Sequence, residues 1–373
     1  MSEAVELQAP VQNGRRWGVL RDVVISVGVI GLIWLGLRVL RDPEAFSEWG
    51  DLTGKLAQAM LALVLGIAGI WALFIVVNSL VEHLPARAAE LVRPWIFVLP
   101  ALAVVAVYLV YPAIRTIIQS FTEVPEGGGI FSNYIEAFTD PAVQIAIRNN
   151  VIWLLLAPAA AVVIGLAFAA LADRVKHESL AKTFVFVPLA ISMVGASVIW
   201  GYMYAWRVPG TDQVGFINGV IQFFGGEPIP FLFEIPINTY AMIVIMIWLQ
   251  VGFAMVILSA AIKGVPVELT EAARIDGASE LQNFFKVLVP SIRGSIITVF
   301  TTIAIVVLKV FDIVYTLTGG NLETEVVALR MYDAMFRFRN FGQATAMAVI
   351  LFLAVVPIMI VNVRNLRKQG IEA

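Results

Sequence analysis

Lys309 and Asp312 stand three residues apart in an otherwise apolar stretch, and they are the side chains best placed to move an ion or a proton. At that spacing the two charges would share one face of a helix. Charged side chains inside apolar helices are typical of ion and proton pathways. The pair therefore admits an ion-coupled transporter, although we favour a structural or gate-related pair near the outer end of its helix.

Other reaction chemistry lacks the residues it needs. The chain has no cysteine, which excludes disulfides, thiolate metal sites and thiol catalysis. Its two histidines, His83 and His177, have no H-E-x-x-H spacing, and no serine, acid and histidine set is present. The phosphate-binding pattern G-x-x-x-x-G-K-[ST] is also missing. We expect no catalytic residue, metal or cofactor bound by this chain, and hence no enzyme.

Composition places these residues in a membrane protein. Of 373 residues, 60% are hydrophobic and only 14% are charged, whereas soluble domains are about half apolar and a quarter charged. The net charge of −2 gives no basic surface for nucleic acid. The fold class expected is an all-α integral membrane protein in the lipid bilayer.

About eight transmembrane helices are predicted, because a span needs roughly 20 mostly apolar residues. Six of these stretches carry no charge, and the other two, Val23–Leu40 and Gly294–Thr318, carry one or two charges. We read the first of these two as a retained helix and not as a removed signal peptide. The six uncharged stretches are Leu56–Val81, Pro94–Ile114, Asn149–Ala172, Thr183–Trp206, Ile235–Ile262 and Asn340–Val363.

The distribution of Lys and Arg predicts the orientation. With both termini in the cytoplasm, the tails and inner loops hold the larger share of the basic residues, as the positive-inside rule requires. The long connections Arg115–Arg148 and Arg207–Glu234 then lie outside and are predicted to be loops with short interfacial pieces, since glycine and proline recur in them.

One inner loop, Lys263–Arg293, is too polar for lipid and too regular for a simple connection. Pro266 suits the first turn of a helix, and Asp276 with Gly277 would end it. A small apolar surface on this helix could enter a shallow groove on another protein. Its members are Val267, Ala272, Ala273 and Ile275.

A second helix is predicted in the same loop. Ser279 and Gln282 form a capping box, and the helix should end before Pro290. Its apolar residues recur at spacings of three and four, which favours packing back onto the membrane helices. They are Leu281, Phe284, Phe285 and Leu288. An amphipathic interfacial loop of no special function would show the same pattern.

Five residues of this loop stand at fixed spacings: Glu271, Ala272, Ala273, Gly277 and Pro290. On these residues the loop resembles the EAA loop of ATP-binding-cassette importer permeases, in which EAA is followed by three residues, Gly, nine residues and I-x-L-P. Val287 and Val289 stand in place of the usual Ile and Leu. Gln282–Lys286, Lys309–Tyr315 and Thr318–Gly320 further resemble the MalF-type, carbohydrate-importing branch.

This resemblance implies the MalF-like permease fold of type I importers. Residues 1–92 would form a cytoplasmic tail and two extra helices, and residues 93–373 the permease core with its EAA loop at 263–293. The chain would import sugar, of oligosaccharide or glucoside type, through a bacterial or archaeal cytoplasmic membrane. It would work with a second, MalG-like permease, two ATPase subunits that use ATP and Mg²⁺, and an extracytoplasmic solute-binding protein.

The resemblance also implies roles for residues. Glu271 would anchor the first loop helix in a cleft of the ATPase, Ala272 and Ala273 would permit close approach, and Asp276, Gly277 and Pro290 complete the coupling motif. Replacing Glu271 or Gly277 should uncouple the ATPase. Arg115–Arg148 is far shorter than the domain inserted there in the maltose subunit, so no such domain is expected.

Candidates for the solute pathway follow from the chemistry of sugars, which stack on aromatic rings and bond to amides. By alignment with the resembled subunit, Phe253 falls at a sugar-stacking position and Gln250 one turn earlier. Tyr202 and Tyr204 are further candidates, with an interfacial aromatic belt as the alternative. Apolar residues occupy the pocket positions of the next helix, which leaves this chain's share of the site open: Ile303, Val306, Val307 and Val310.

Two other classes stay open at this point. The solute could be different, such as glycerol-3-phosphate or a polyamine. Alternatively the chain could be a secondary transporter that uses Lys309 and Asp312. Uptake by this chain alone, driven by an ion gradient without ATP, would separate the second class from the importer.

Overall fold

The computed structural model describes residues 27–28, 31–40, 51–82, 85–172 and 175–372, and every regular element among them is helical. The chain divides into two compact units, Met1–Ala113 and Ile114–Ala373. Five described helices are long and apolar enough to span a membrane, and two bent helix pairs raise the number to seven. With the shorter helix Gly31–Leu40, each of the eight predicted spans coincides with apolar helix in the described residues. Residues 23–26 and 29–30 of the predicted span Val23–Leu40 lie outside the described residues.

Unit 1 contains α2 (Asp51–Glu82) and α3 (Ala86–Val105), followed without a break by η2 (Ala106–Val110) and α4 (Tyr111–Thr122). The division between the units falls within α4, later than the proposed domain boundary at residue 92. The five-residue turn η2 is a π-helix. Pro112 follows it, and a widened turn relieves the clash between a proline ring and the carbonyl four residues earlier.

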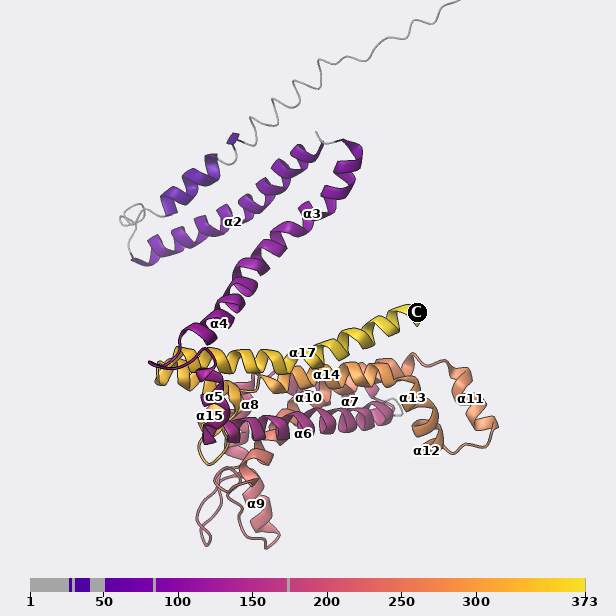
Figure 1. The fold of residues 1–373 in the computed structure, drawn as a ribbon. Helices are drawn as coiled ribbons and strands as arrows, with labels where there is room; N and C mark the ends of the chain where they lie inside the picture. The colour runs from indigo at the N-terminus through magenta and orange to yellow at the C-terminus, as the bar shows by residue number, and fades with distance from the viewer. Residues whose placement is uncertain (1–26, 29–30, 41–50, 83–84, 173–174, 373) are drawn as a thin grey trace, which may run out of the picture. The chain divides into compact units, whose positions relative to one another are not determined.

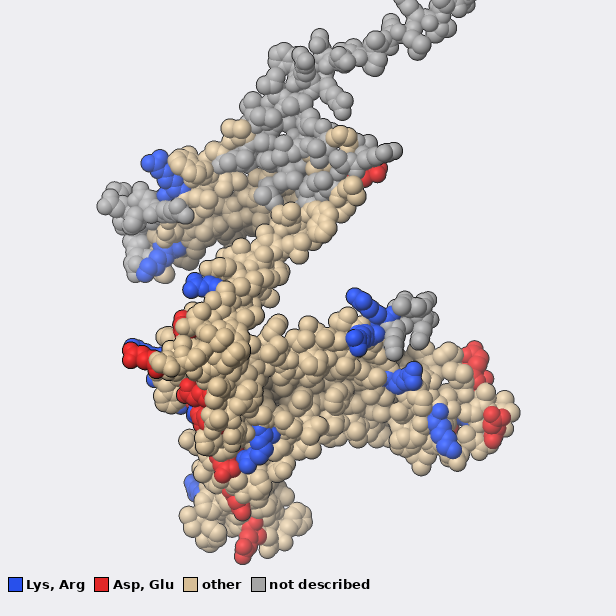
Figure 2. Space-filling view, viewed as in Figure 1, with Lys and Arg blue, Asp and Glu red and all other residues tan. Residues whose placement is uncertain are grey.

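In unit 2 the long helices α6 (Pro141–Ala172), α10 (Ile237–Lys263), α14 (Arg293–Leu308) and α17 (Phe341–Glu372) lie side by side (Figure 1). The most enclosed of them is α10, which packs along α6. A Cβ built on Gly165 would lie 2.6 Å from the Cβ of Ala254, so glycine allows these helices their close approach. On the face in Figure 2, charged side chains gather toward the two ends of unit 2.

Two predicted spans are broken, which corrects the sequence prediction. Thr183–Trp206 consists of α7 (Glu178–Phe186), the 3₁₀ turn η3 (Val187–Ala190) and α8 (Met193–Met203), and the pair bends by 102°. Pro188 removes a backbone donor in the turn. Ser192 then starts α8 by accepting a hydrogen bond from the Gly195 N–H at 3.0 Å.

The second broken span is Gly294–Thr318. Its helix α14 ends at Leu308, and α15 (Asp312–Leu317) begins after a three-residue break. The side-chain amide of Asn150 donates to the Leu308 carbonyl at 3.2 Å, which satisfies a backbone group that the break releases. Sequence hydropathy cannot reveal this break, because the bond comes from α6.

Short helices lie at the ends of unit 2. One end carries α11 (Val267–Ile275), α12 (Glu280–Asn283) and α13 (Val289–Ser291), and we call it the α11 end. The opposite end carries α5 (Ser132–Thr139) and α15 (Figure 1). The chain between α15 and α17 forms α16 (Val327–Tyr332) and the π turn η5 (Asp333–Arg337), while α9 (Phe216–Phe223) lies in the long connection before α10.

Candidate functional site

The first helix of the EAA-like loop forms as predicted. Pro266 is the N-cap residue of α11, with φ −54° and ψ 131°, and Asp276 is the C-cap residue. Most of the helix is exposed, and its apolar side chains share that exposure: Val267, Leu269 and Ile275, the last at 86%. Burying no side chain of its own, α11 is held by its ends and not by a core.

The end of α11 is a Schellman motif built on Gly277. The Ala278 N–H donates to the Ala273 carbonyl at 2.9 Å and the Gly277 N–H to the Arg274 carbonyl at 3.0 Å. This geometry puts Gly277 at φ +83°, in the left-handed region that glycine occupies without strain. Glycine at this position therefore fixes where α11 stops.

The predicted capping box of the second helix is also confirmed. The Gln282 N–H donates to the Ser279 hydroxyl at 3.3 Å, and the Ser279 N–H donates to the Gln282 side chain at 2.9 Å. An ion pair of 3.1 Å between Arg274 and Glu280 joins α11 to α12. The two helices are thus tied by local contacts into one unit.

The predicted end of the second helix before Pro290 is wrong. After α12 the chain forms the π turn η4 (Phe284–Leu288) and continues through Pro290, which is exposed, to Ser291. The carbonyl four residues before Pro290 belongs to Lys286, inside the π turn. The wider turn makes room for the proline ring, as η2 does before Pro112.

The apolar face of the second helix packs back only in part. Phe284 and Leu288 are half-buried, whereas Leu281 and Phe285 are exposed. Leu281, Phe284 and Phe285 of this face line a groove of about 370 Å³, together with Ala167, Ala170 and Leu171 near the end of α6. The loop therefore touches the bundle but leaves apolar surface on both of its helices.

An ion-pair cluster joins the base of this loop to α7. Glu178 pairs with Lys182 one turn later, at 2.6 Å, and also with Lys263, the last residue of α10. Lys182 in turn hydrogen-bonds Ser259 of α10. Because Lys263 lies three residues before Pro266, the ion pair links α7 to the start of the loop that carries α11.

The motif residues occupy accessible positions on this loop. Glu271 and Ala272 are exposed, and Ala273 is half-buried. Asp276 is exposed, and its backbone N–H donates to the Ala272 carbonyl at 3.0 Å. The carboxylate of Glu271 is thus presented to the surroundings and not used inside the bundle.

Gln250 and Phe253 lie one turn apart on α10, as the sequence indicates. Gln250 is only 7% exposed, and among the described residues its side-chain amide makes no hydrogen bond. Phe253 is half-buried and packs against the core. An amide in this position has its hydrogen-bonding capacity free for a water molecule or a solute hydroxyl.

The two tyrosines differ from each other. Tyr202 is 75% exposed, while Tyr204 is 4% exposed and its hydroxyl donates to the Ala241 carbonyl at 3.0 Å. The Tyr204 ring packs against Trp200 and Phe231, with centroid distances of 5.2 and 5.0 Å. Within this chain, Tyr204 thus has a packing role and Tyr202 keeps a free ring.

The apolar positions on α14 and in the break after it are mostly buried in the core. Ile303, Val307 and Val310 are at most 1% exposed, and Val306 is half-buried. Ile303, Val307 and Val310 pack in the same cluster as the central residues of α10. This explains why they are aliphatic: they fill space between helices and offer no group to a solute.

Lys309 and Asp312 do not share a helix face, which corrects the first expectation. Lys309 caps the end of α14 and Asp312 begins α15, on opposite sides of the break. No ion pair joins them in the described part of the chain. The observation that favoured an ion-coupled transporter is thereby lost.

Sequence reasoning missed a set of buried asparagines that hold the loop between α15 and α16. The Asn149 amide donates to the Glu323 and Glu325 carbonyls at 2.7 and 2.8 Å, and Asn238 donates to the Leu322 carbonyl at 2.8 Å. Leu322 and Glu323 both have φ +57°. The signal in the sequence was the presence of asparagine near the ends of apolar spans, and a count of charged residues does not detect asparagine.

Comparison with known proteins adds the family context. The family described as binding-protein-dependent transport system inner membrane component matches residues 153–368. The osmoprotective compounds uptake permease protein GgtC of Synechocystis sp. is 47% identical over 73% of this chain and 98% of its own length. The alpha-glucoside transport system permease protein AglF of Rhizobium meliloti is 46% identical over 76% of this chain and 85% of its own length.

Among solved structures, the fold is similar to a chain of a bacterial alginate ABC transporter in complex with its alginate-bound periplasmic protein. The TM-score is 0.62 at 21% identity, and the match covers 74% of this chain and 94% of the other. At this identity the similarity concerns the fold alone. The fold of this chain thus resembles that of a chain of an ABC transporter.

Proposed function

Since the chain belongs to the family of binding-protein-dependent transport system inner membrane components, we propose that it is the permease subunit of an ATP-driven importer of glucoside-type sugars. The helices of unit 2 would form part of the path, and the loop at α11 would receive mechanical work from an ATPase. The chain itself carries out no reaction in this scheme.

The substrate class is supported by the relatives. AglF is described as an alpha-glucoside permease and GgtC as a permease for osmoprotective compounds, each nearly half identical to this chain. More distant relatives are described as lactose and trehalose/maltose permeases. A glycosidic solute fits the three descriptions that name a sugar, whereas 'osmoprotective compounds' is chemically broad. We therefore prefer a glycosidic solute to glycerol-3-phosphate or a polyamine.

The exposed helix α11 is the observation that carries the coupling role. It projects apolar side chains and the carboxylate of Glu271 away from the bundle, and it buries nothing of its own. The Schellman motif at Gly277 and the Arg274–Glu280 ion pair give it a fixed shape. A rigid, exposed helix of this kind suits a shallow cleft on a partner.

The partners proposed are a second, MalG-like permease, two ATPase subunits that bind ATP and Mg²⁺, and an extracytoplasmic solute-binding protein. Both termini and the α11 end would then face the cytoplasm, in agreement with the excess of Lys and Arg there. Closure of the ATPases would turn α11 as a rigid body, and the Glu178 cluster would transmit the motion to α7.

For the solute path we propose Gln250 and Phe253 as the contacts of this chain. The unbonded amide of Gln250 would bond to a sugar hydroxyl, and Phe253 would offer an apolar face one turn away. Tyr202 remains a candidate near the opposite end of unit 2. Tyr204 is a weaker candidate, because its ring and hydroxyl are engaged in packing.

The test is uptake by the reconstituted transporter. The chain is expressed with its neighbouring transport genes, purified as a complex and placed in liposomes with MgATP inside and the solute-binding protein outside. We expect uptake of a labelled α-glucoside that requires both ATP and the binding protein. A Gln250→Leu variant should take up the same sugar with a several-fold higher KM, while its assembly is unchanged.

Two results would overturn the proposal. Uptake by this chain alone, driven by an ion gradient without ATP, would assign it to the secondary transporters. ATP-dependent uptake of a polyamine or a phosphate ester, with no response to glucosides, would keep the importer and reject the sugar.

A further inference from the structure

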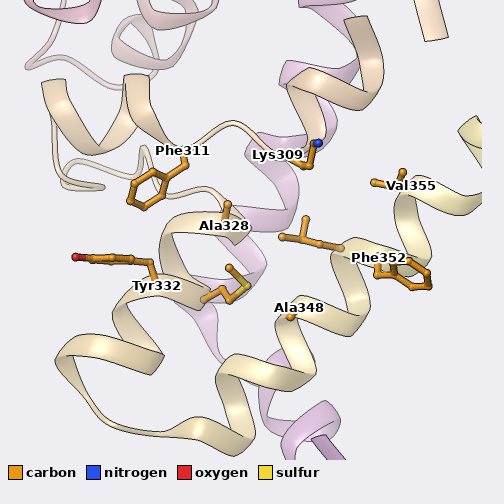
Figure 3. A pocket seen from close by; sticks show the side chains of 9 residues that line it. Lys309, Phe311, Ala328, Tyr332, Ala348, Phe352 and Val355 are labelled. Carbon is orange, nitrogen blue, oxygen red and sulfur yellow. The ribbon is translucent and has the colours of Figure 1, made fainter. Parts of the chain in front are cut away.

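A groove on the side of unit 2 has a lining unlike any site described so far. It encloses about 570 Å³ and runs between α17 on one side and α16 with the α14–α15 break on the other. Phe352 and Val355 line it from α17, and Ala328 lies across from them on α16 (Figure 3). Leu351 and Met331 also line the groove. We call this space the α17 groove.

Lys309 brings a positive charge to the α17 groove. It is exposed and lines the groove at the point where α14 ends (Figure 3). Among the described residues it forms no ion pair, and Asp312 lies beyond the break, at the start of α15. A cation within a membrane-spanning segment is costly unless an anion or water meets it.

The walls offer nothing polar besides this lysine. Phe311 and Tyr332 close one end with their rings 5.2 Å apart, and the Tyr332 hydroxyl points away from α17 (Figure 3). A sugar in the groove would therefore leave its hydroxyl groups without partners, which is unfavourable. The lining instead suits a long hydrocarbon chain with one negative charge at a fixed distance along it.

The depth of Lys309 agrees with such a ligand. The sixteen residues of α14 place it about 24 Å along the helix from Arg293. In a hydrocarbon layer of about 30 Å, a lysine there lies close enough to the far interface for its side chain to extend to the headgroups. The far interface is the one opposite the α11 end.

We propose that the α17 groove binds one anionic phospholipid of the leaflet opposite the α11 end. An acyl chain lies against Leu351, Phe352 and Val355, and the phosphate meets the ammonium group of Lys309. The ligand neutralises the charge and covers the apolar walls together, which neither a free ion nor a neutral lipid can do. The inference goes beyond the proposed function and does not depend on the transported solute.

Native mass spectrometry of the purified full-length complex tests the proposal. After removal of lipid, the complex is titrated with phosphatidylglycerol or with phosphatidylcholine of the same acyl chains. We expect one tightly held phosphatidylglycerol and weaker binding of phosphatidylcholine. Lys309→Gln should weaken phosphatidylglycerol binding about fivefold, the effect of losing one basic group near a membrane surface, and Lys309→Arg should retain it.

Matched variants keep the test informative if the Lys309 variants fold poorly. Ala348 lies on the face of α17 that lines the groove, whereas Ala354 is exposed elsewhere on the same helix. Ala348→Phe should fill the groove and abolish tight binding, and Ala354→Phe should not. Lys176→Gln removes a different exposed cation and should have no effect.

Three results would overturn the proposal. The first is equal affinity for the two lipids, and the second is unchanged phosphatidylglycerol binding in both Lys309→Gln and Ala348→Phe. The third is photocrosslinking from position 352 to another polypeptide and not to lipid, which would make the groove a contact between subunits.

Discussion

At Gly277 the backbone adopts φ +83°, and a Cβ built there would meet no atom within 4 Å. A Cβ at this position therefore clashes with nothing in this chain, and the strain of a substitution comes from the backbone conformation. The left-handed conformation costs roughly 1–2 kcal/mol for an ordinary residue, and asparagine tolerates it better. This separation of causes makes Gly277 the most decisive single residue for the coupling role.

We therefore predict that Gly277→Val disorders the end of α11 and uncouples the ATPase. A penalty of one to two kcal/mol changes the balance of states by a factor of about 5–30, so solute-stimulated ATPase activity should fall by a comparable factor. Gly277→Asn should retain most of the activity, because asparagine tolerates the left-handed conformation although its side chain is larger than that of glycine. Normal stimulation in the valine variant would contradict the assignment.

Glu271 gives a second prediction at this scale. Glu271→Gln should weaken the retention of ATPase subunits during purification, since the carboxylate is exposed and available as an anchor. Glu268→Gln is the control, because Glu268 is exposed on the same helix but outside the motif. The measurement is the ratio of ATPase to permease after washing in salt, and equal ratios for the two variants would reject the anchoring role.

Among the elements, the loop between α15 and α16 and the start of α16 are held by residues far away in the sequence. The Asn150 oxygen accepts from the Val327 N–H at 2.8 Å, and its amide donates to the Leu308 carbonyl, so one side chain joins α6 to the ends of α14 and α16. Arg148 adds an ion pair with Glu323 at 3.0 Å. The two left-handed residues, Leu322 and Glu323, accept through their carbonyls from Asn238 and Asn149.

Removing this support should destabilise unit 2. Asn150→Ala leaves a buried carbonyl and a buried N–H without partners, which costs about 1–3 kcal/mol for each group left unsatisfied. The melting temperature of the detergent-solubilised protein should fall by several degrees. Asn321→Ala removes an exposed hydrogen bond in the same loop and serves as the control. Equal melting temperatures for the two variants would show that the loop is held in another way.

On the scale of the whole molecule, the chain is longer than the relatives it matches. The alignment with GgtC covers 98% of that protein but 73% of this chain. The family match begins at residue 153, and the two compact units divide at residue 113. The division into residues 1–92 and a permease core from residue 93 stays a proposal.

A truncation tests that division. A chain that starts at residue 93 should insert, assemble with its partners and transport, because it keeps α4. A chain that starts at residue 123 should not, since it loses Ser120, whose hydroxyl lies 2.7 Å from that of Tyr134 and whose carbonyl accepts from Asn133. Uptake in liposomes measures both, and failure of the longer chain would show that residues 1–92 are needed.

The predictions from sequence succeeded where the determining contacts are local. The helix start at Pro266, its end at Gly277 and the capping box at Ser279 depend on hydrogen bonds over three to five residues, which a sequence displays directly. They failed at the breaks after Phe186 and Leu308 and at Pro290. In those places, hydropathy is unchanged while the backbone departs from a regular α-helix.

By itself, the sequence determined that this is a helical membrane protein with an exposed, capped loop of the importer type, because hydropathy and helix caps act over short distances. Only the tertiary structure decided which polar groups are used inside the bundle. In the structure Tyr204 is a packing residue, Asn150 joins α6 to α14 and α16, and Lys309 is the single charge in the lining of the α17 groove. Such roles depend on partners as far as 177 residues away along the chain, and no local pattern records them.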